Sequence, residues 1–384
     1  MFLQYDFSMH YNTGKNPERL IFLLLMISVS LNPATAGEYK FINGLVAESD
    51  VRYGIIMSHT ESIRYAINSN IAGLELSLST KTYGRNGWDK LYRYPGLGIG
   101  YVFTTLGNKD IFGNGHAIFP FVNFPFIAKE KKLHTGYRIS LGLGYVSKQF
   151  HVHENPLNMA ISSGLNMYVS LRFYTNYQFN SNNEFTASVE FSHFSNGKIG
   201  SPNMGLNTGV INLGYRYKIT NSRYNILHHQ YPVLSKRHQA EVFLSGGTKT
   251  DDQLSNKYYP IASVTCGYKY ILNDKYAAGT GIDFFYDPSL GPNKVAVSRG
   301  METYDSEDLF QAGIHAAIHA RYARITAFGN IGTYIYASYV KYTRIYTRIG
   351  LRYDITKNLI FNLSVKAHYA NADFIEWGVG YRLF

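Results

Sequence analysis

The sequence places a histidine and a serine two residues apart, His193 and Ser195, where an alternating segment runs into a turn-rich loop. An imidazole can accept a proton from a neighbouring hydroxyl, so the pair has the composition of a general base beside a nucleophile. On a β-strand such residues share a face and lie about 7 Å apart at the backbone, close enough for the ring to reach the hydroxyl. The chemistry open to the pair depends on the surroundings of that face.

The elements that carry the pair are short alternating runs with the period of β-strands. About eight runs precede residue 220 and about eight follow residue 237, separated by turn-forming residues such as Asn273-Asp274. Tyr (34), Phe (24) and Gly (35) are abundant, and only 16% of residues are charged. Segments of roughly ten residues that alternate between apolar and polar side chains are typical of a transmembrane β-barrel. The fold expected is therefore an all-β, antiparallel outer-membrane barrel.

The number of barrels is left open by this pattern. The first group of runs ends Leu-Gly-Tyr-Arg-Tyr at 213–217 and the second ends Val-Gly-Tyr-Arg-Leu at 379–383, which hints at two related halves. We favour one barrel of about 14–16 strands, with two fused eight-stranded units as the alternative, since bacterial barrels take even strand numbers from 8 upward. In the single barrel, residues 220–238 form a loop or turn.

The period of two places the histidine and the serine on the lipid side of the barrel. The residues that share their face are apolar and those on the other face are polar: Phe185, Ala187, Val189 and Phe191 against Thr186, Ser188, Glu190 and Ser192. In the next run, Asn207 has the parity of Ile211 and Leu213. Polar side chains that face lipid cost several kcal/mol unless they are satisfied, so His193, Ser195 and Asn207 form a candidate functional patch.

Residues 20–31 are apolar, follow Lys15 and Arg19, and precede Ala34-Thr35-Ala36. This order is typical of a secretory signal peptide, which we expect to span residues 1–36. The domains expected are then this signal, a barrel half at 37–220 that carries the site, and additional barrel strands at 221–384 that end at Phe384.

Composition narrows the cofactors and partners. The single cysteine, Cys266, cannot form an internal disulfide and is too few for a metal-thiolate site, so no metal or organic cofactor is expected. The formal charge of +11 suits an anionic partner. The basic residues do not form runs, which argues against nucleic acid and favours a phosphate-bearing membrane surface.

Around the histidine and serine, the sequence resembles the PagL-type lipid A 3-O-deacylases and the related acyloxyacyl hydrolases of Bacteroides-like bacteria. The matching residues are His193-Phe194-Ser195-Asn196-Gly197, Pro202-Asn203 and Gly205-Leu206-Asn207. The resemblance implies an outer-membrane serine esterase that removes an ester-linked acyl chain from lipid A in the outer leaflet. It also implies that His193 is the base and Ser195 the nucleophile, with Asn196 and Gly197 as oxyanion-binding candidates.

The sequence departs from this family at the third catalytic position. Asn207 aligns with the family's glutamate, and an amide can orient the imidazole but supplies no charge. Replacing the acid of a serine triad by its amide can cost about 10⁴ in rate. Glu190 has the wrong parity to act directly, so the acidic member is absent, replaced by Asn207, or supplied from elsewhere.

Two other classes of protein fit parts of the pattern. A non-catalytic pore or structural barrel could retain the motif, with Arg344, Arg348 and Arg352 facing inward along an aqueous lumen. A secreted carbohydrate-binding β-sandwich would also alternate, but the long strands and the aromatic residues near strand ends favour the barrel.

Overall fold

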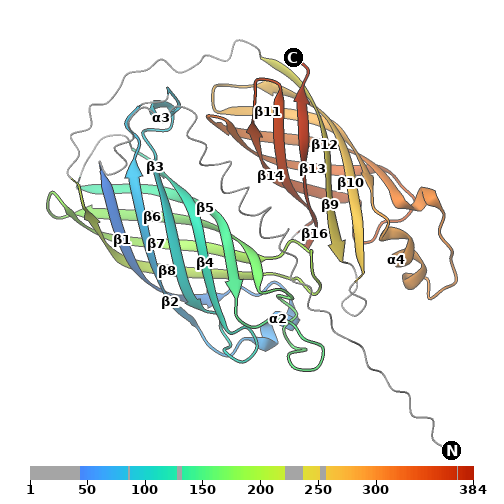
Figure 1. Cartoon of the computed structure of the whole chain (residues 1–384), viewed down its shortest axis with the longest axis horizontal. Helices are drawn as coiled ribbons and strands as arrows, with labels where there is room; N and C mark the ends of the chain where they lie inside the picture. The colour runs from blue at the N-terminus through green and yellow to red at the C-terminus, as the bar shows by residue number, and fades with distance from the viewer. Residues whose placement is uncertain (1–43, 85–86, 128–131, 221–236, 251–256, 370) are drawn as a thin grey trace, which may run out of the picture. The chain divides into compact units, whose positions relative to one another are not determined.

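The protein folds into two closed barrels of eight antiparallel strands each (Figure 1). The computed structural model describes residues 44–384 except for 85–86, 128–131, 221–236, 251–256 and 370. The predicted antiparallel barrel fold is confirmed, in its two-unit form. The single barrel that we favoured is wrong, because β8 turns back to pair with β1 instead of leading into a larger sheet.

The first barrel closes through the pairing of its first and last strands, from Val46 opposite Lys218 to Ile56 opposite Thr208. Its strands are β1 (Leu45–Ile56), β2 (Ile71–Lys81), β3 (Gly96–Thr105), β4 (Asn114–Pro125), β5 (Leu133–Val146), β6 (Leu165–Gln178), β7 (Asn183–Ser195) and β8 (Leu206–Lys218).

The second barrel closes through β16 and β9, from Trp377 opposite Gly246 to Arg382 opposite Glu241. Its strands are β9 (His238–Thr250), β10 (Tyr258–Ile271), β11 (Tyr276–Tyr286), β12 (Phe310–Tyr322), β13 (Ile325–Ala337), β14 (Ile345–Asp354), β15 (Leu359–His368) and β16 (Asn371–Arg382).

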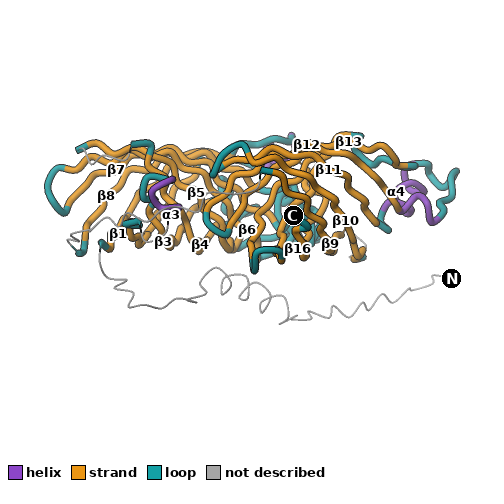
Figure 2. Tube along the Cα trace, turned by 90° about the horizontal axis from the view of Figure 1, so that it is seen from above, coloured by secondary structure: helices purple, strands orange, loops and turns teal. Residues whose placement is uncertain are grey.

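Short helices occur in the connections between strands (Figure 2). They are α2 (Glu61–Ala66), α3 (Gly87–Leu91), α4 (Leu290–Val297) and the 3₁₀ helix η1 (Ser306–Leu309). No helix within the described residues is long and apolar enough to cross a membrane.

The alternating runs read from the sequence fall on these strands, eight in each barrel. The expected domain limits lie in the connections: the strands occupy residues 45–218 and 238–382. The proposed signal peptide at 1–36 lies outside the described residues, and so does most of the expected loop at 220–238.

The two ends of each barrel differ in their connections. At the end that carries Ser195, the loops of the first barrel are 57–70, 106–113, 147–164 and 196–205. The second barrel has short turns at one end, residues 272–275, 323–324 and 355–358, and longer loops at the other, including 287–309 and 338–344. We call these two ends of the second barrel its short-turn end and its long-loop end.

Paired charges fill part of the interior of the first barrel, and a buried apolar cluster that includes Phe194 fills another part. Arg172 lies 2.9 Å from Asp50 and 2.7 Å from Glu190, and Arg52 lies 2.9 Å from Glu190. Arg138 joins the network through Glu48 at 2.9 Å and through Glu75 at 3.0 Å. Eight-stranded barrels are just wide enough for side chains to fill, and these charges form a continuous ionic network within the lumen.

The second barrel is also filled, and this bears on the pore alternative. Arg348 lies 2.7 Å from Asp283 and also pairs with Glu376, while the Arg352 guanidinium lies over the rings of Phe243 and Phe328. Both arginines point inward as expected, but they pack against partners instead of lining an open channel. The third predicted lining residue, Arg344, is exposed and precedes β14.

Candidate functional site

The histidine and the asparagine singled out from the sequence form a cross-strand pair on the outer face of the first barrel. His193 on β7 stands opposite Asn207 on β8, and Nδ1 of His193 lies 2.6 Å from Oδ1 of Asn207. Along the same strands, Phe191 and Ile211 are exposed on this outer face. The pair is therefore a polar patch at the edge of an apolar, lipid-facing surface. A proton on Nδ1 leaves Nε2 of His193 free to act as a base.

A second histidine, His59, contacts the amide nitrogen of Asn207. Nδ2 of Asn207 lies 3.1 Å from Nδ1 of His59, in the loop after β1. An amide can turn over and exchange its oxygen for its NH₂ group, which would present His193 with a donor instead of an acceptor. Because the His59 nitrogen accepts from the NH₂ group, it keeps the amide oxygen directed at His193.

Ser195 ends strand β7, and its hydroxyl is held by two N–H donors. The Gly197 backbone N–H donates to Ser195 Oγ at 3.1 Å, and Nδ2 of Asn203 donates at 2.8 Å. The serine is 8% exposed, beneath the loop 196–205. Two donors that converge on a nucleophilic oxygen can also stabilise negative charge that develops beside it.

The side chain of Asn196 lies elsewhere than the sequence reasoning placed it. Its Nδ2 donates to the hydroxyls of Ser162 at 3.0 Å and Ser163 at 3.1 Å, in the connection between β5 and β6. Its backbone N–H donates to Oδ1 of Asn203 at 3.1 Å. Asn196 thus ties two loops together, and Gly197 and Asn203 are the groups that contact Ser195.

A glycine at position 205 allows the imidazole to sit where it does. Gly205 has φ of +75°, a conformation that residues with a side chain rarely adopt. A Cβ atom at this position would lie 2.4 Å from Cε1 of His193. Any larger residue would push the imidazole away from its place beside Asn207.

The base and the nucleophile are not joined in this arrangement. The structure describes both side chains, and no hydrogen bond links His193 to Ser195 there. Catalytic hydrogen bonds are often long without substrate and tighten in the reacting complex. Reaction through this pair therefore requires the serine hydroxyl to turn from its loop donors toward Nε2 of His193.

Glu190 is separated from the pair by the wall of the barrel. Its carboxylate faces the lumen, where it pairs with Arg52 and Arg172 and accepts a hydrogen bond from Tyr168 at 3.0 Å. This agrees with its parity in the sequence. No carboxylate within the described residues forms a hydrogen bond or ion pair with His193, whose side-chain hydrogen bond goes to Asn207.

Sequence reasoning missed two members of this cluster. Asn203 lies within the matching motif, and its position in the loop after Ser195 is the signal that could have identified its role. His59 gave no signal, because it lies far upstream in a turn and meets Asn207 only when β1 pairs with β8 to close the barrel.

Comparison with known families agrees with this geometry. Residues 72–216 match the family model for lipid A 3-O-deacylase (PagL), and residues 238–384 match the model for the C-terminal domain of acyloxyacyl hydrolase. The chain thus contains one region similar to the lipid A 3-O-deacylases and one similar to the C-terminal domain of acyloxyacyl hydrolases. The first match covers β2 to β8 and so includes the His193–Asn207 pair, and the second coincides with the second barrel.

These two matches show an outer-membrane β-barrel and an ester hydrolase of the lipid A deacylase type. It also gives the second barrel an identity, because that barrel corresponds to a domain described in acyloxyacyl hydrolases and not simply to extra strands.

Solved structures of outer-membrane barrels align with parts of the chain. The outer-membrane enzyme PagL is 14% identical, with a TM-score of 0.29, and covers 45% of this chain and 99% of its own. Neisserial surface protein A is 12% identical, with a TM-score of 0.30, and covers 46% of this chain and 97% of its own. A mutant Rhodopseudomonas blastica porin is 9% identical, with a TM-score of 0.17, over 88% of this chain and 99% of its own. No match was found among curated proteins.

Proposed function

We propose that the protein removes an ester-linked fatty acyl chain from lipid A in the outer leaflet, with Ser195 as the nucleophile and His193 as the general base. The observation that carries the proposal is the His193–Asn207 pair, in which a satisfied imidazole stands on a surface that otherwise faces lipid. A site in that position can meet an acyl chain without withdrawing it from the membrane.

The reaction would proceed through an acyl-enzyme. Nε2 of His193 accepts the hydroxyl proton of Ser195 as Oγ attacks the ester carbonyl. The tetrahedral oxyanion is stabilised by the Gly197 N–H and the Asn203 amide, which converge on Ser195 Oγ. His193 then protonates the departing sugar alkoxide, and water, activated by the same imidazole, releases the fatty acid.

The surroundings of the pair support a lipid substrate. Val169 on β6 stands opposite His193, and Phe191 lies two residues before it on β7; both are exposed on the outer face. An acyl chain laid against these residues would pass beside the imidazole. The loops at the Ser195 end include residues 147–164, and bacterial barrels carry their longer loops on the extracellular side. This favours the outer leaflet, where lipid A resides.

Mass spectrometry of lipid A tests the assignment. Cells that make the wild-type protein should lose one acyl chain from lipid A, and cells that make Ser195→Ala should keep it. Ser192→Ala is the matched control, because Ser192 lies on the same strand but faces the lumen, where its hydroxyl bonds to Thr208 at 2.6 Å. If Ser195→Ala is folded in the outer membrane and deacylates as the wild type does, Ser195 is not the nucleophile.

A further inference from the structure

The short-turn end of the second barrel holds more positive than negative charge. Among the described residues, four cationic side chains face the lumen there, Lys269, Arg321, Arg352 and Arg382, against two carboxylates, Glu241 and Asp354. Lys269, Arg352 and Asp354 are each 8% exposed or less. Buried charge is costly when it is not compensated, so this cluster is incomplete as it stands.

The ion pairs confirm that the two carboxylates are shared. Glu241 lies 2.7 Å from Lys269, 2.9 Å from Arg382 and 3.4 Å from Arg352. Asp354 lies 3.0 Å from both Arg382 and Arg321. Each carboxylate therefore serves two or three cations, so the four cations at this end outnumber the two carboxylates that pair with them.

The other charge clusters in the protein lack this surplus. The lumen of the first barrel pairs five cations with five carboxylates: Arg52, Arg138, Arg172, Arg216 and Lys218 with Glu48, Asp50, Glu75, Glu184 and Glu190. Toward the long-loop end of the second barrel, Lys249 and Lys366 share Asp373, and Lys249 also pairs with Asp287 at the mouth. Between the two ends, Arg348 pairs with both Asp283 and Glu376, and this excess of one carboxylate leaves a net surplus of one positive charge at the short-turn end.

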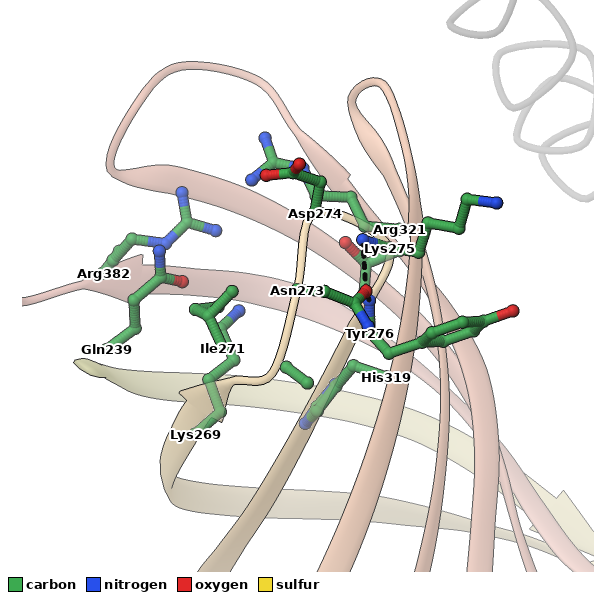
Figure 3. Close-up of a pocket in the computed structure, with 12 residues that line it drawn as sticks. Gln239, Lys269, Ile271, Asn273, Asp274, Lys275, Tyr276, His319, Arg321 and Arg382 are labelled. Atoms are coloured by element: carbon green, nitrogen blue, oxygen red, sulfur yellow. Dashed lines mark hydrogen bonds between the residues drawn. The ribbon is translucent and has the colours of Figure 1, made fainter. Parts of the chain in front are cut away.

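A pocket opens at this end and reaches the surplus charge (Figure 3). Lys269, Arg321, Arg382 and His319 line it. The turn between β10 and β11 forms its rim, where Asp274 and Lys275 carry opposite charges. Nδ1 of His319 is buried without a hydrogen-bond partner, and the residue is 8% exposed. An unsatisfied ring nitrogen in a cationic pocket marks a place for a further polar group.

The rim of the pocket is fixed by the turn itself. Oδ1 of Asn273 accepts hydrogen bonds from the backbone N–H groups of Lys275 at 2.9 Å and Tyr276 at 3.0 Å (Figure 3). The cavity has a volume of about 20 Å³, whereas a single water needs about 10–15 Å³. Its enclosed part therefore holds about one water, and a larger group would lie partly in the open mouth, beside the exposed parts of Arg321 and Arg382.

We infer that the short-turn mouth of the second barrel binds one phosphate group. A phosphate carries the negative charge that the cluster lacks and has oxygens that can accept from several cationic donors at once. Arg321 and Arg382 have partly exposed side chains, at 25% and 13%, through which the group can enter. Free phosphate and the headgroup of a membrane phospholipid share this chemistry. The inference is independent of the deacylase site on the first barrel.

Thermal unfolding of the full-length protein in a non-ionic detergent tests the inference. Inorganic phosphate should raise Tm in a saturable way, and sodium chloride at equal ionic strength should not, because a ligand that binds only the folded state stabilises it. Glycerol phosphate then distinguishes the sources: competition with inorganic phosphate points to a lipid headgroup, and its failure to compete points to the free ion. Either result supports a phosphate site.

Lys269→Gln gives the sharper prediction. Without phosphate it should raise Tm, since it removes one surplus charge and leaves Glu241 paired with Arg352 and Arg382. It should also weaken phosphate binding at least tenfold, and His319→Phe should weaken binding without that gain. Lys218→Gln is the control, because Lys218 pairs with Glu184 in the balanced first barrel and its loss should leave phosphate binding unchanged. The inference is overturned if phosphate and chloride act alike, or if Lys269→Gln binds phosphate as the wild type does.

Discussion

An amide at position 207 gives His193 an acceptor without a negative charge. A hydrogen bond from Nδ1 selects the tautomer with a free Nε2, which is the orienting task of the third triad member. The second task, stabilising the imidazolium that forms during the reaction, is left to a neutral oxygen. The enzyme therefore has the geometry of a triad without its electrostatic part.

Restoring that charge should accelerate the reaction. We expect Asn207→Glu to raise kcat at least tenfold, because a carboxylate stabilises the protonated imidazole; the converse replacement in a serine triad can cost about 10⁴. Initial rates on purified lipid A in mixed micelles measure the effect. The control is Asn207→Gln, which adds the same length without the charge. Asn212→Glu cannot be the control, because Asn212 is buried in the lumen. Equal rates for the two variants would mean that charge at position 207 does not limit the reaction.

His59 should matter only while position 207 is an amide. In the wild type, His59→Leu removes the acceptor that keeps the amide oxygen facing His193. We expect kcat to fall about tenfold, the equivalent of one net hydrogen bond, with KM little changed. The two oxygens of a carboxylate are equivalent, so the same change made in Asn207→Glu should have little effect.

This double-mutant comparison separates orientation from simple damage. A loop that was merely disrupted by His59→Leu would lose activity to the same extent in both backgrounds. ¹⁵N chemical shifts of the His193 ring, which report its tautomer, provide a readout that does not depend on activity. An unchanged tautomer in His59→Leu would contradict the positioning role.

At the scale of the strand, the site is anchored from inside the barrel. Phe194, between the base and the nucleophile, is fully buried against Tyr168, with ring centroids 5.0 Å apart. Opposite it, Leu206 is also fully buried, next to Asn207. The inward residues thus hold the end of β7 and the start of β8 while their neighbours face outward.

Removing the anchor should destabilise the barrel and loosen the site. We expect Phe194→Ala to lower the free energy of unfolding by about 3–5 kcal/mol, the usual cost of such a cavity. Phe191→Ala is the matched control, since Phe191 lies on the same strand but is 44% exposed on the lipid face. Urea unfolding in a common detergent measures both. If the two variants lose equal stability, the apolar cluster inside the barrel does not anchor β7.

The strands show how much of the fold and of the site could be predicted from the sequence. Alternation predicted the fold class, the position of all the described strands and the outward parity of His193 and Asn207, because a period of two is a local property. Closure is not local. Whether β8 pairs with β1 or leads on to β9 depends on long-range pairing, and the alternating pattern is the same in both cases. The contacts of His59 and the turn of the Asn196 side chain toward Ser162 depend on that closure and on loop conformation, so no periodicity predicts them.

At the scale of the molecule, the backbone pairing of the strands is complete within each barrel, although the loop 196–205 also hydrogen-bonds to Thr250 at the end of β9. Every strand of β1–β8 pairs with two neighbours from the same set, so the first barrel has no open edge that the second must cover. The ion pairs of its lumen also lie within residues 48–218. The groups assigned to the reaction, from His59 to Asn207, come from this barrel alone.

A chain that ends at Thr220 should therefore fold and deacylate lipid A. Closure by β1 and β8 satisfies the backbone without residues 221–384, and the five-to-five balance of lumen charges is retained. A difference in migration between unheated and heated samples in gel electrophoresis reports the folded barrel, and mass spectrometry of lipid A reports activity, with Ser195→Ala in the shortened chain as the blank. A shortened chain that is folded but inactive would show that the second barrel contributes to the reaction itself, which would move part of the catalytic machinery into a domain where the sequence has no second His-x-Ser pair.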